Sequence, residues 1–188
     1  MKSRMIISAV ALALLSVSTV CAADSKEEEQ AKIRKGVSQT LQDLYKLQPG
    51  AQAAIQKAPG YAVFKNFGTN LLVVSTASGK GIATNNQTKQ DTFMKMISAG
   101  AGLGVGVKDF RVVFVFGTDK AFNNFLDSGW SGSAQTDAAA KAGKSGGAVS
   151  GAVEVAPDVY VYQFTKNGLA LQLTLQGTKY YKDDDLNK

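Results

Sequence analysis

Four glycines alternate with other residues between positions 100 and 106, in the segment SAGAGLGVGVKDFRVVFVF (residues 98–116). With the two-residue period of a β-strand, these glycines fall on one face, and small or aliphatic residues fall on the other. A strand with one bare face lets another segment approach closely or lets the sheet bend sharply. The segment therefore predicts a strand in a strongly curved or barrel-like sheet.

The same glycines do not have the spacing of a nucleotide-binding loop. In a dinucleotide fingerprint the third glycine follows the second by three positions and opens a helix, but that position holds Val105 or Val107 here. Residues 110–116 are rich in β-branched and aromatic side chains, which favour a strand. A Walker motif also fails, because Ala138 stands where its first glycine is needed. We therefore expect no nucleotide partner.

Residues 1–23 have the pattern of a signal peptide. Basic residues precede the apolar run 5–20, which is shorter than the roughly 20 residues of a spanning helix, and small residues follow it. We expect cleavage after Ala23 and a periplasmic or secreted protein, with an uncleaved membrane anchor as the alternative. Lipoprotein anchoring through Cys21 is not expected, because the bulky Val20 precedes it.

Residues 24–188 are long enough for one domain with a substantial core. Its first part, residues 25–57, has the pattern of helices: Ser25 and Glu28 have the spacing of a capping box, and apolar residues then recur at helical spacing on one face. These apolar residues are Ile33, Val37, Leu41 and Leu44. We expect this face to pack on the sheet, with binding to a membrane surface as the alternative. A short second helix is predicted over 51–57, before Pro59.

After Gly60 the hydrophobic period changes from 3.6 to 2, which predicts strands. Three strand pairs are expected. They are 61–67 with 70–76, 80–84 with 92–98, and 160–165 with 169–175 around the turn Asn167-Gly168. In the last strand, leucines on one face predict a core side. The fold class is therefore α+β: N-terminal amphipathic helices followed by a mainly antiparallel, strongly curved sheet.

One short helix interrupts the strands, because Thr118 can cap residues 119–126, whose aromatic side chains have helical spacing. The Gly/Ala-rich region 129–156 is interpreted as strands of small residues, with a flexible linker as the alternative. The acidic segment Asp183–Asp185 is interpreted as a solvated tail.

The residue types argue against catalysis. The chain has no histidine, and cleavage after Ala23 removes its single cysteine, so we expect no enzyme activity, no metal site and no cofactor. Loss of Lys2 and Arg4 leaves 19 basic against 15 acidic side chains, a net charge of +4. This excess is spread along the chain and weak, so nucleic acid is not an expected partner.

Three segments together resemble the SYLF, or Ysc84-like, domain: residues 60–85, 98–126 and 160–187. The glycines and hairpin residues that carry the resemblance are Gly79, Gly81, Gly102, Gly104, Gly106, Lys166, Gly168, Leu169 and Gly177. The resemblance implies an α+β module that binds lipid or a membrane surface. Gln176 and the segment TKQDTFMKM (88–96) depart from the family pattern, so the phosphoinositide and actin binding of eukaryotic relatives is not carried over.

With that resemblance, basic residues near the hairpin turns become candidates for binding anionic phospholipid. These are Lys65, Lys80, Lys95, Lys108 and Arg111. The alternative function is an envelope structural or protein-interaction module that contacts an envelope protein through an exposed sheet face or edge.

Overall fold

A computed structural model of the chain describes residues 10–65, 76–99, 111–132, 149, 151–165, 168–169 and 177–188. The chain divides into two units, residues 1–32 and 33–188, and the second contains all the described strands. Several predictions lie outside the described residues: the Gly-rich strand 100–106, Lys108, strand 70–76 except Thr76, the leucine face of 169–175 beyond Leu169, and most of 129–156.

The first helix, α1, runs without a break from Val10 to Leu47. It passes through Ser25, so the predicted helix start at Ser25 is wrong for this chain. The sequence before Ser25 is rich in alanine and leucine and forms helix readily, so no cap is needed there. The expected end before Pro49 is confirmed, and α2 (Gly50–Lys57) follows as predicted.

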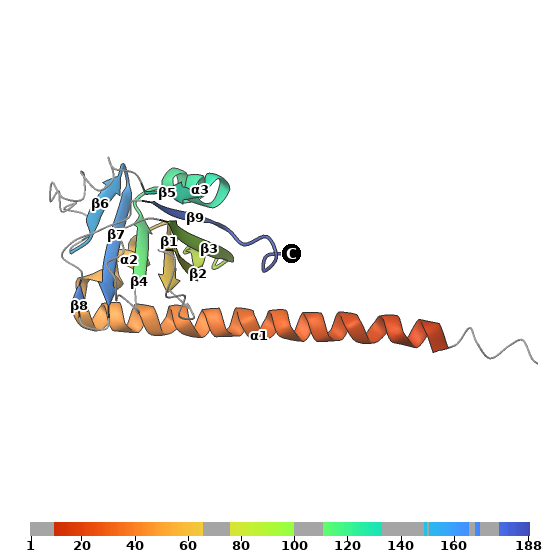
Figure 1. The fold of residues 1–188 in the computed structure, drawn as a ribbon. Helices are drawn as coiled ribbons and strands as arrows, with labels where there is room; N and C mark the ends of the chain where they lie inside the picture. Colours follow the sequence, from red (N-terminus) through yellow and green to blue (C-terminus); the bar gives the residue numbers. More distant parts are fainter. Residues whose placement is uncertain are drawn as a thin grey trace, which may run out of the picture. The chain divides into compact units, whose positions relative to one another are not determined.

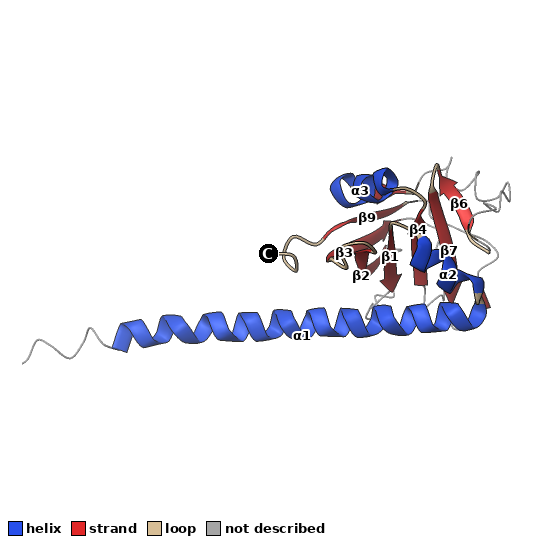
Figure 2. Ribbon diagram, turned by 180° about the vertical axis from the view of Figure 1, so that it is seen from behind, coloured by secondary structure: helices blue, strands red, loops and turns tan. Residues whose placement is uncertain are grey.

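The described strands form one antiparallel sheet that is strongly curved (Figures 1 and 2). The strand order is β5-β9-β3-β2-β1-β4-β7-β6, and β8 pairs with β7 off this path. The bounds are β1 Gly60–Lys65, β2 Thr76–Asn85, β3 Asp91–Ala99, β4 Arg111–Phe116, β5 Trp130–Ser131, β6 Val153–Ala156, β7 Val159–Thr165, β8 Gly168–Leu169 and β9 Thr178–Lys182. The predicted fold class is confirmed.

Two local predictions are confirmed as far as the described residues reach. The β2–β3 hairpin closes at the pair Thr84 and Asp91, and the β7–β8 hairpin closes at Thr165 and Gly168. Gly168 has a φ of 128°, which is a conformation that favours glycine. These turns match the positions that turn chemistry indicates. The predicted pairing of 61–67 with 70–76 is wrong for residues 61–65, because β1 pairs with residues 80–85 of β2 on one side and with β4 on the other.

The helix α3 (Asp119–Ser128) also begins where predicted. The side chain of Thr118 accepts a hydrogen bond from the amide of Ala121 at 3.3 Å. Phe122 and Phe125 are buried, so the aromatic face of α3 packs against the sheet.

The sheet has an apolar core on each face, because alternate residues of every strand point to opposite sides. On one face, here the α3 face, Phe64 and Phe114 belong to a buried cluster with Phe125 of α3. On the other face, here the α1 face, Val63 and Val113 belong to a second cluster. Its helix members include Ile33, Val37 and Leu44 of α1 and Ala51 and Ile55 of α2. Packing of this α1 segment on the sheet is therefore confirmed.

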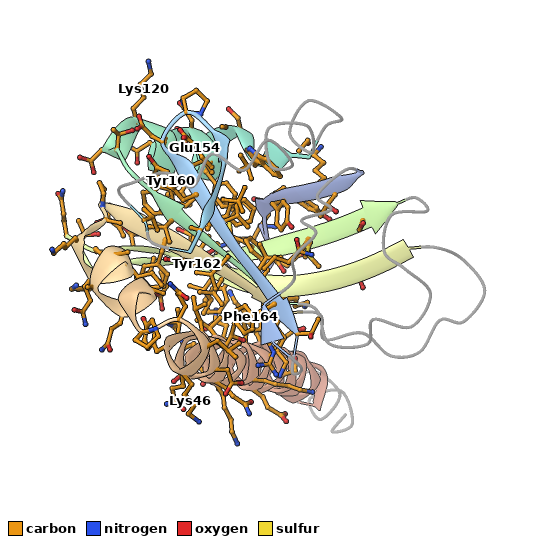
Figure 3. All side chains as sticks on the ribbon, turned by 90° about the vertical axis from the view of Figure 1, so that its left-hand side faces the viewer. Lys46, Lys120, Glu154, Tyr160, Tyr162 and Phe164 are labelled. Carbon is orange, nitrogen blue, oxygen red and sulfur yellow. The ribbon has the colours of Figure 1, made fainter. Side chains whose placement is uncertain are left out.

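Side chains along β7 show the layering on the α1 face. Tyr162 and Phe164 belong to the cluster of that face, and Phe164 lies at the end of β7 next to α1 (Figure 3). Lys46 points away from the sheet on the other side of α1 (Figure 3). The helix thus buries one stripe and exposes the opposite one.

The α3 face is dominated by aromatic rings around Tyr180 of β9. Its ring centroid lies 4.7 Å from that of Phe64 and 4.8 Å from that of Phe114, in edge-to-face geometry. The ring of Trp130 lies 5.9 Å away. Such pairs stabilise a core beyond the area that they bury. Among the described residues the hydroxyl of Tyr180 finds no hydrogen-bond partner.

Glycine at position 81 allows a close approach between β2 and β1. A Cβ atom added to Gly81 would lie 2.1 Å from the carbonyl oxygen of Val63 and 2.6 Å from the ring of Phe64. The ring of Phe64 thus fills the space that a side chain at position 81 would need. A Cβ atom added to Gly79 would lie 2.8 Å from the carbonyl oxygen of Lys65.

We predict that Gly81→Ala lowers the free energy of unfolding by about 2 kcal/mol, because overpacking against backbone costs more than the intrinsic gain of replacing glycine. Gly117→Ala is the matched control, since the nearest neighbours of its added Cβ would be side-chain atoms at 3.3–3.4 Å, which need to shift by only a few tenths of an ångström. Chemical denaturation measures both. Equal stability of the two variants would contradict the prediction.

We predict that Tyr180→Phe raises the free energy of unfolding by about 1 kcal/mol, because it removes a buried hydroxyl without a partner among the described residues. Tyr162→Phe is the control: Tyr162 is also buried, but its hydroxyl is not among the buried side-chain atoms of the described residues that lack a partner, so its loss brings no such gain. Destabilisation by Tyr180→Phe, measured by denaturation, would mean that its hydroxyl is satisfied in solution.

The same variants test a pH dependence. Burial raises the pKa of Tyr180 well above its ordinary 10.0, and raises the pKa of Tyr162 to about 12. Above pH 10 the unfolded chain releases these protons while the folded protein retains them, so stability falls as the pH rises from 10 toward 12. Tyr180→Phe should make this fall shallower, and an unchanged profile would contradict the assignment.

Candidate functional site

Four of the five basic residues predicted from the sequence lie side by side across four neighbouring strands. Lys95 of β3 is paired in register with Lys80 of β2, Lys80 with Lys65 of β1, and Lys65 with Arg111 of β4. Directly opposite residues in an antiparallel sheet share a face, with Cβ atoms about 5 Å apart. These four residues are called the basic row. The fifth, Lys108, is outside the described residues.

The basic row lies on the α1 face of the sheet. Lys65 follows Val63 by two residues on β1, and Val63 belongs to the cluster that packs against α1. The same two-residue step relates Lys95 to Phe93, which is also in that cluster. The row is therefore the continuation of the α1-face core toward one end of these strands.

Arg111 forms one end of the row and is only 2% exposed. Its guanidinium forms an ion pair with Asp43 of α1 and lies 5.8 Å from the ring centroid of Phe164. The prediction treated Arg111 as a surface contact for lipid, whereas the structure holds it inside the domain. Burial of a guanidinium requires such a partner, and α1 supplies it. Arg111 therefore ties α1 to β4.

Lys95 forms the other end of the row. Its ammonium nitrogen lies 2.9 Å from a carboxylate oxygen of Asp183 and 3.3 Å from one of Asp185. The hydrogen bond to Asp183 raises the pKa of Lys95. Lys65 and Lys80 occupy the middle of the row, are partly exposed and make further contacts within the protein.

The partner of Lys95 belongs to a C-terminal segment that is folded rather than solvated. Asp183 is 1% exposed, so the prediction of a solvated acidic tail is wrong for this residue. Its carboxylate accepts hydrogen bonds from the amides of Asp185 and Leu186 at 3.2 and 3.3 Å. Leu186 is buried in the α1-face cluster. The carboxylate of Asp183 can be buried because the two amides of the turn and the ammonium of Lys95 satisfy it.

Asn187 attaches the same segment to β3. Its amide nitrogen donates to the carbonyl oxygen of Phe93 at 2.7 Å, and its side-chain oxygen accepts from the Phe93 amide at 2.9 Å. The amide of Asp183 also donates to the Phe93 carbonyl, at 2.9 Å. Residues 183–188, here the C-terminal latch, thereby satisfy the backbone of β3 just beyond the end of its pairing with β9.

A second row of side chains lies beside the basic row on the same face, and sequence reasoning missed it. The second row consists of Lys179 of β9, Ile97 of β3 and Ser78 of β2. Ile97 of β3 is paired with Lys179 of β9 and Ser78 of β2, and Lys95 is paired with Tyr181 of β9. Ile97 is 45% exposed. The ammonium of Lys179 lies 6.0 Å from the ring centroid of Tyr181. Strand alternation predicts that Lys179 and Tyr181 share one face of β9. The pairing of β9 with β3 cannot be predicted from local sequence, because the two strands are far apart in the chain.

Two further arrangements complete the described part of the site. Arg34 of α1 forms an ion pair with Asp91 and lies 5.0 Å from the ring centroid of Phe93. This pair borders an open groove of about 340 Å³ between α1 and the sheet, lined also by Leu41 and Tyr61. Within the described ranges, no group of three or more metal-ligating side chains is found, and no helix is long and apolar enough to cross a bilayer.

We predict that Asp183→Ala lowers the free energy of unfolding by about 3 kcal/mol, because it removes the buried partner of Lys95 and the cap of the latch. Asp184→Ala is the matched control, since Asp184 is the exposed neighbour. Hydrogen exchange at the Phe93 amide should also become faster in Asp183→Ala. Equal stability of the two variants would show that the latch is not attached in solution.

The fold and site define a small α+β domain in which helices cover both faces of a curved antiparallel sheet and cations line one face. Residues 97–188 match the model of the Ysc84 family, described as "Las17-binding protein actin regulator". Over residues 97–188 the chain is thus similar to the Ysc84, or SYLF, family. The matched region contains Arg111 of the basic row, but not its three lysines. It also contains Ile97, β9 and the C-terminal latch.

A curated relative is Beta cell expansion factor A from Aeromonas veronii, to which the chain is 32% identical over 162 residues. The alignment covers 86% of this chain and 60% of that relative. The chain thus spans about 60% of the length of the curated relative that it matches.

Proposed function

We propose that the domain is a non-catalytic, exported membrane-surface module that binds anionic phospholipid through the basic row. The observation that carries the proposal is the register that aligns Lys95, Lys80, Lys65 and Arg111 on one face of four adjacent strands. Lipid binding is general among SYLF domains, which supports the class of ligand.

The physical argument starts from the repulsion within the row. Like charges directly opposite each other on neighbouring strands destabilise a sheet, and this cost grows where the side chains are partly removed from water. An anionic phosphate between neighbouring lysines lowers that repulsion and accepts charge-assisted hydrogen bonds from both. Arg111 is buried and paired with the partly exposed Asp43, so it contributes to the local electrostatic field rather than by direct contact with a phosphate.

The proposed compartment follows from the predicted signal peptide, residues 1–23. Cleavage after Ala23 would deliver the domain to an envelope or extracellular space, where it would meet a membrane surface. A protein partner in the envelope is the second candidate, and the family description, which names a protein ligand, favours keeping it. At the edges of the described sheet, β5 has two residues and β6 has four with a bulge, which leaves little edge for strand addition.

We predict that Lys65→Gln/Lys80→Gln weakens binding to phosphatidylglycerol vesicles about 30-fold at low salt, from a contribution of about 1 kcal/mol for each lysine near an anionic surface. The control is Lys57→Gln/Lys120→Gln, which makes the same charge change at exposed lysines of α2 and α3. Flotation with vesicles measures the binding of both variant pairs. The protein is used with the N-terminus that it has when purified from cells.

The control pair should lose less than threefold, and binding of the unaltered protein should weaken as salt screens the charges. Equal losses in the two pairs would mean that net charge alone drives binding. Absence of binding to phosphatidylglycerol and cardiolipin vesicles at low salt would refute the proposed function and favour the protein partner.

A further inference from the structure

We propose that the surface around Ile97 enters the apolar edge of the same bilayer and anchors the domain there. The inference rests on the proposed function and adds a hydrophobic contact to an electrostatic one. Its centre is the second row on the α1 face, which lies on β3 and β9 beside the basic row.

The exposure of Ile97 is at odds with its strand. On β3 the same-face residue Phe93 is 4% exposed and buried against the α1-face cluster, whereas Ile97 is 45% exposed. Among described residues, the other large apolar side chain with comparable exposure is Leu47, at 40%. Phe93 is buried on this face, Asp91 and Lys95 are partly exposed, and Ile97 is the exposed apolar residue at the far end. Moving the exposed part of the Ile97 side chain from water into an apolar phase is favourable.

The surroundings of Ile97 match the chemistry of a membrane interface. Lys179 is directly opposite on β9, and Lys95 and Tyr181 form the neighbouring pair on the same face. Lysines can extend their ammonium groups to headgroup phosphates while their stems stay apolar, and tyrosine favours the interfacial layer. An isoleucine rimmed by lysines and a tyrosine therefore presents apolar contact at the centre and cationic contact at the edge.

Charge complementarity selects an anionic bilayer as the occupant. A second copy docked face to face would bring Lys179 and Lys95 against the same lysines of its partner, which disfavours self-association. Acids also lie near this surface. Asp183 is buried and Asp185, whose side chain is 80% exposed, lies beside Lys95. Asp127 and Asp184 line an open depression together with Lys179 and Tyr181. Asp185 faces the same ammonium that a headgroup would approach, so Lys95 contributes less to the attraction than an unpaired lysine would.

The test separates hydrophobic from electrostatic binding. Vesicles of phosphatidylglycerol are floated with the unaltered protein, Ile97→Ser, and the control Leu47→Ser, at low salt and at about 1 M salt, where charges are screened beyond about 3 Å. We expect binding that survives high salt in the unaltered protein and in Leu47→Ser. Ile97→Ser should lose it about tenfold while remaining folded by circular dichroism.

A second readout follows insertion directly. Ile97→Trp should shift its fluorescence to shorter wavelength when phosphatidylglycerol vesicles are added, and Leu47→Trp should not. The native Trp130 contacts the Tyr180 cluster on the α3 face and supplies a constant background.

The outcomes distinguish the two proposals. If Ile97→Ser binds as the unaltered protein does at both salt concentrations and Ile97→Trp shows no shift, the insertion is refuted while lysine-dependent binding stands. If the unaltered protein does not float with anionic vesicles at all, the proposed function fails and the insertion with it. If Ile97→Ser instead abolishes a dimer seen by sedimentation, or Ile97→Trp responds to an acidic protein and not to vesicles, this surface docks protein and the inference is overturned.

Discussion

Cross-strand register in the antiparallel sheet is the constraint on which the rest of the structure depends. Alternation within each strand sends one set of side chains toward α3 and the other toward α1 and α2, and both sets are buried. The same pairing fixes the order in which residues of different strands meet. A shift by one residue in a single strand would exchange its core and break the alignment of the basic row.

The basic row also links the sheet to the segments on either side of it in the sequence. At one end Arg111 holds Asp43 of α1, and at the other Lys95 holds Asp183 of the C-terminal latch. Both carboxylates reduce the repulsion that four aligned cations create. The charges proposed to bind phospholipid therefore also stabilise the domain. A ligand that competes for Lys95 would act against the attachment of the latch.

Local chemistry in the sequence was sufficient for much of the fold. The cap at Thr118, the turn at Gly168 and the end of α1 before Pro49 depend on neighbouring residues, and each is where the sequence indicates. Long-range pairing was not readable in this way. Nothing near Asp183 shows that Lys95 will meet it, and nothing near Ile97 shows that Lys179 will lie opposite. The basic residues were predicted as separate positions near turns, whereas their alignment and the burial of Arg111 come from strand order.

Hydrogen exchange of the protein with and without phosphatidylglycerol vesicles tests the central claim most directly, because it maps the bound face without altering a residue. The account predicts slower exchange in the β1, β2 and β3 segments that carry Lys65, Lys80 and Lys95, and unchanged exchange in α3 on the opposite face. Protection centred on α3, or vesicle binding that leaves exchange near the three lysines unchanged, would contradict it.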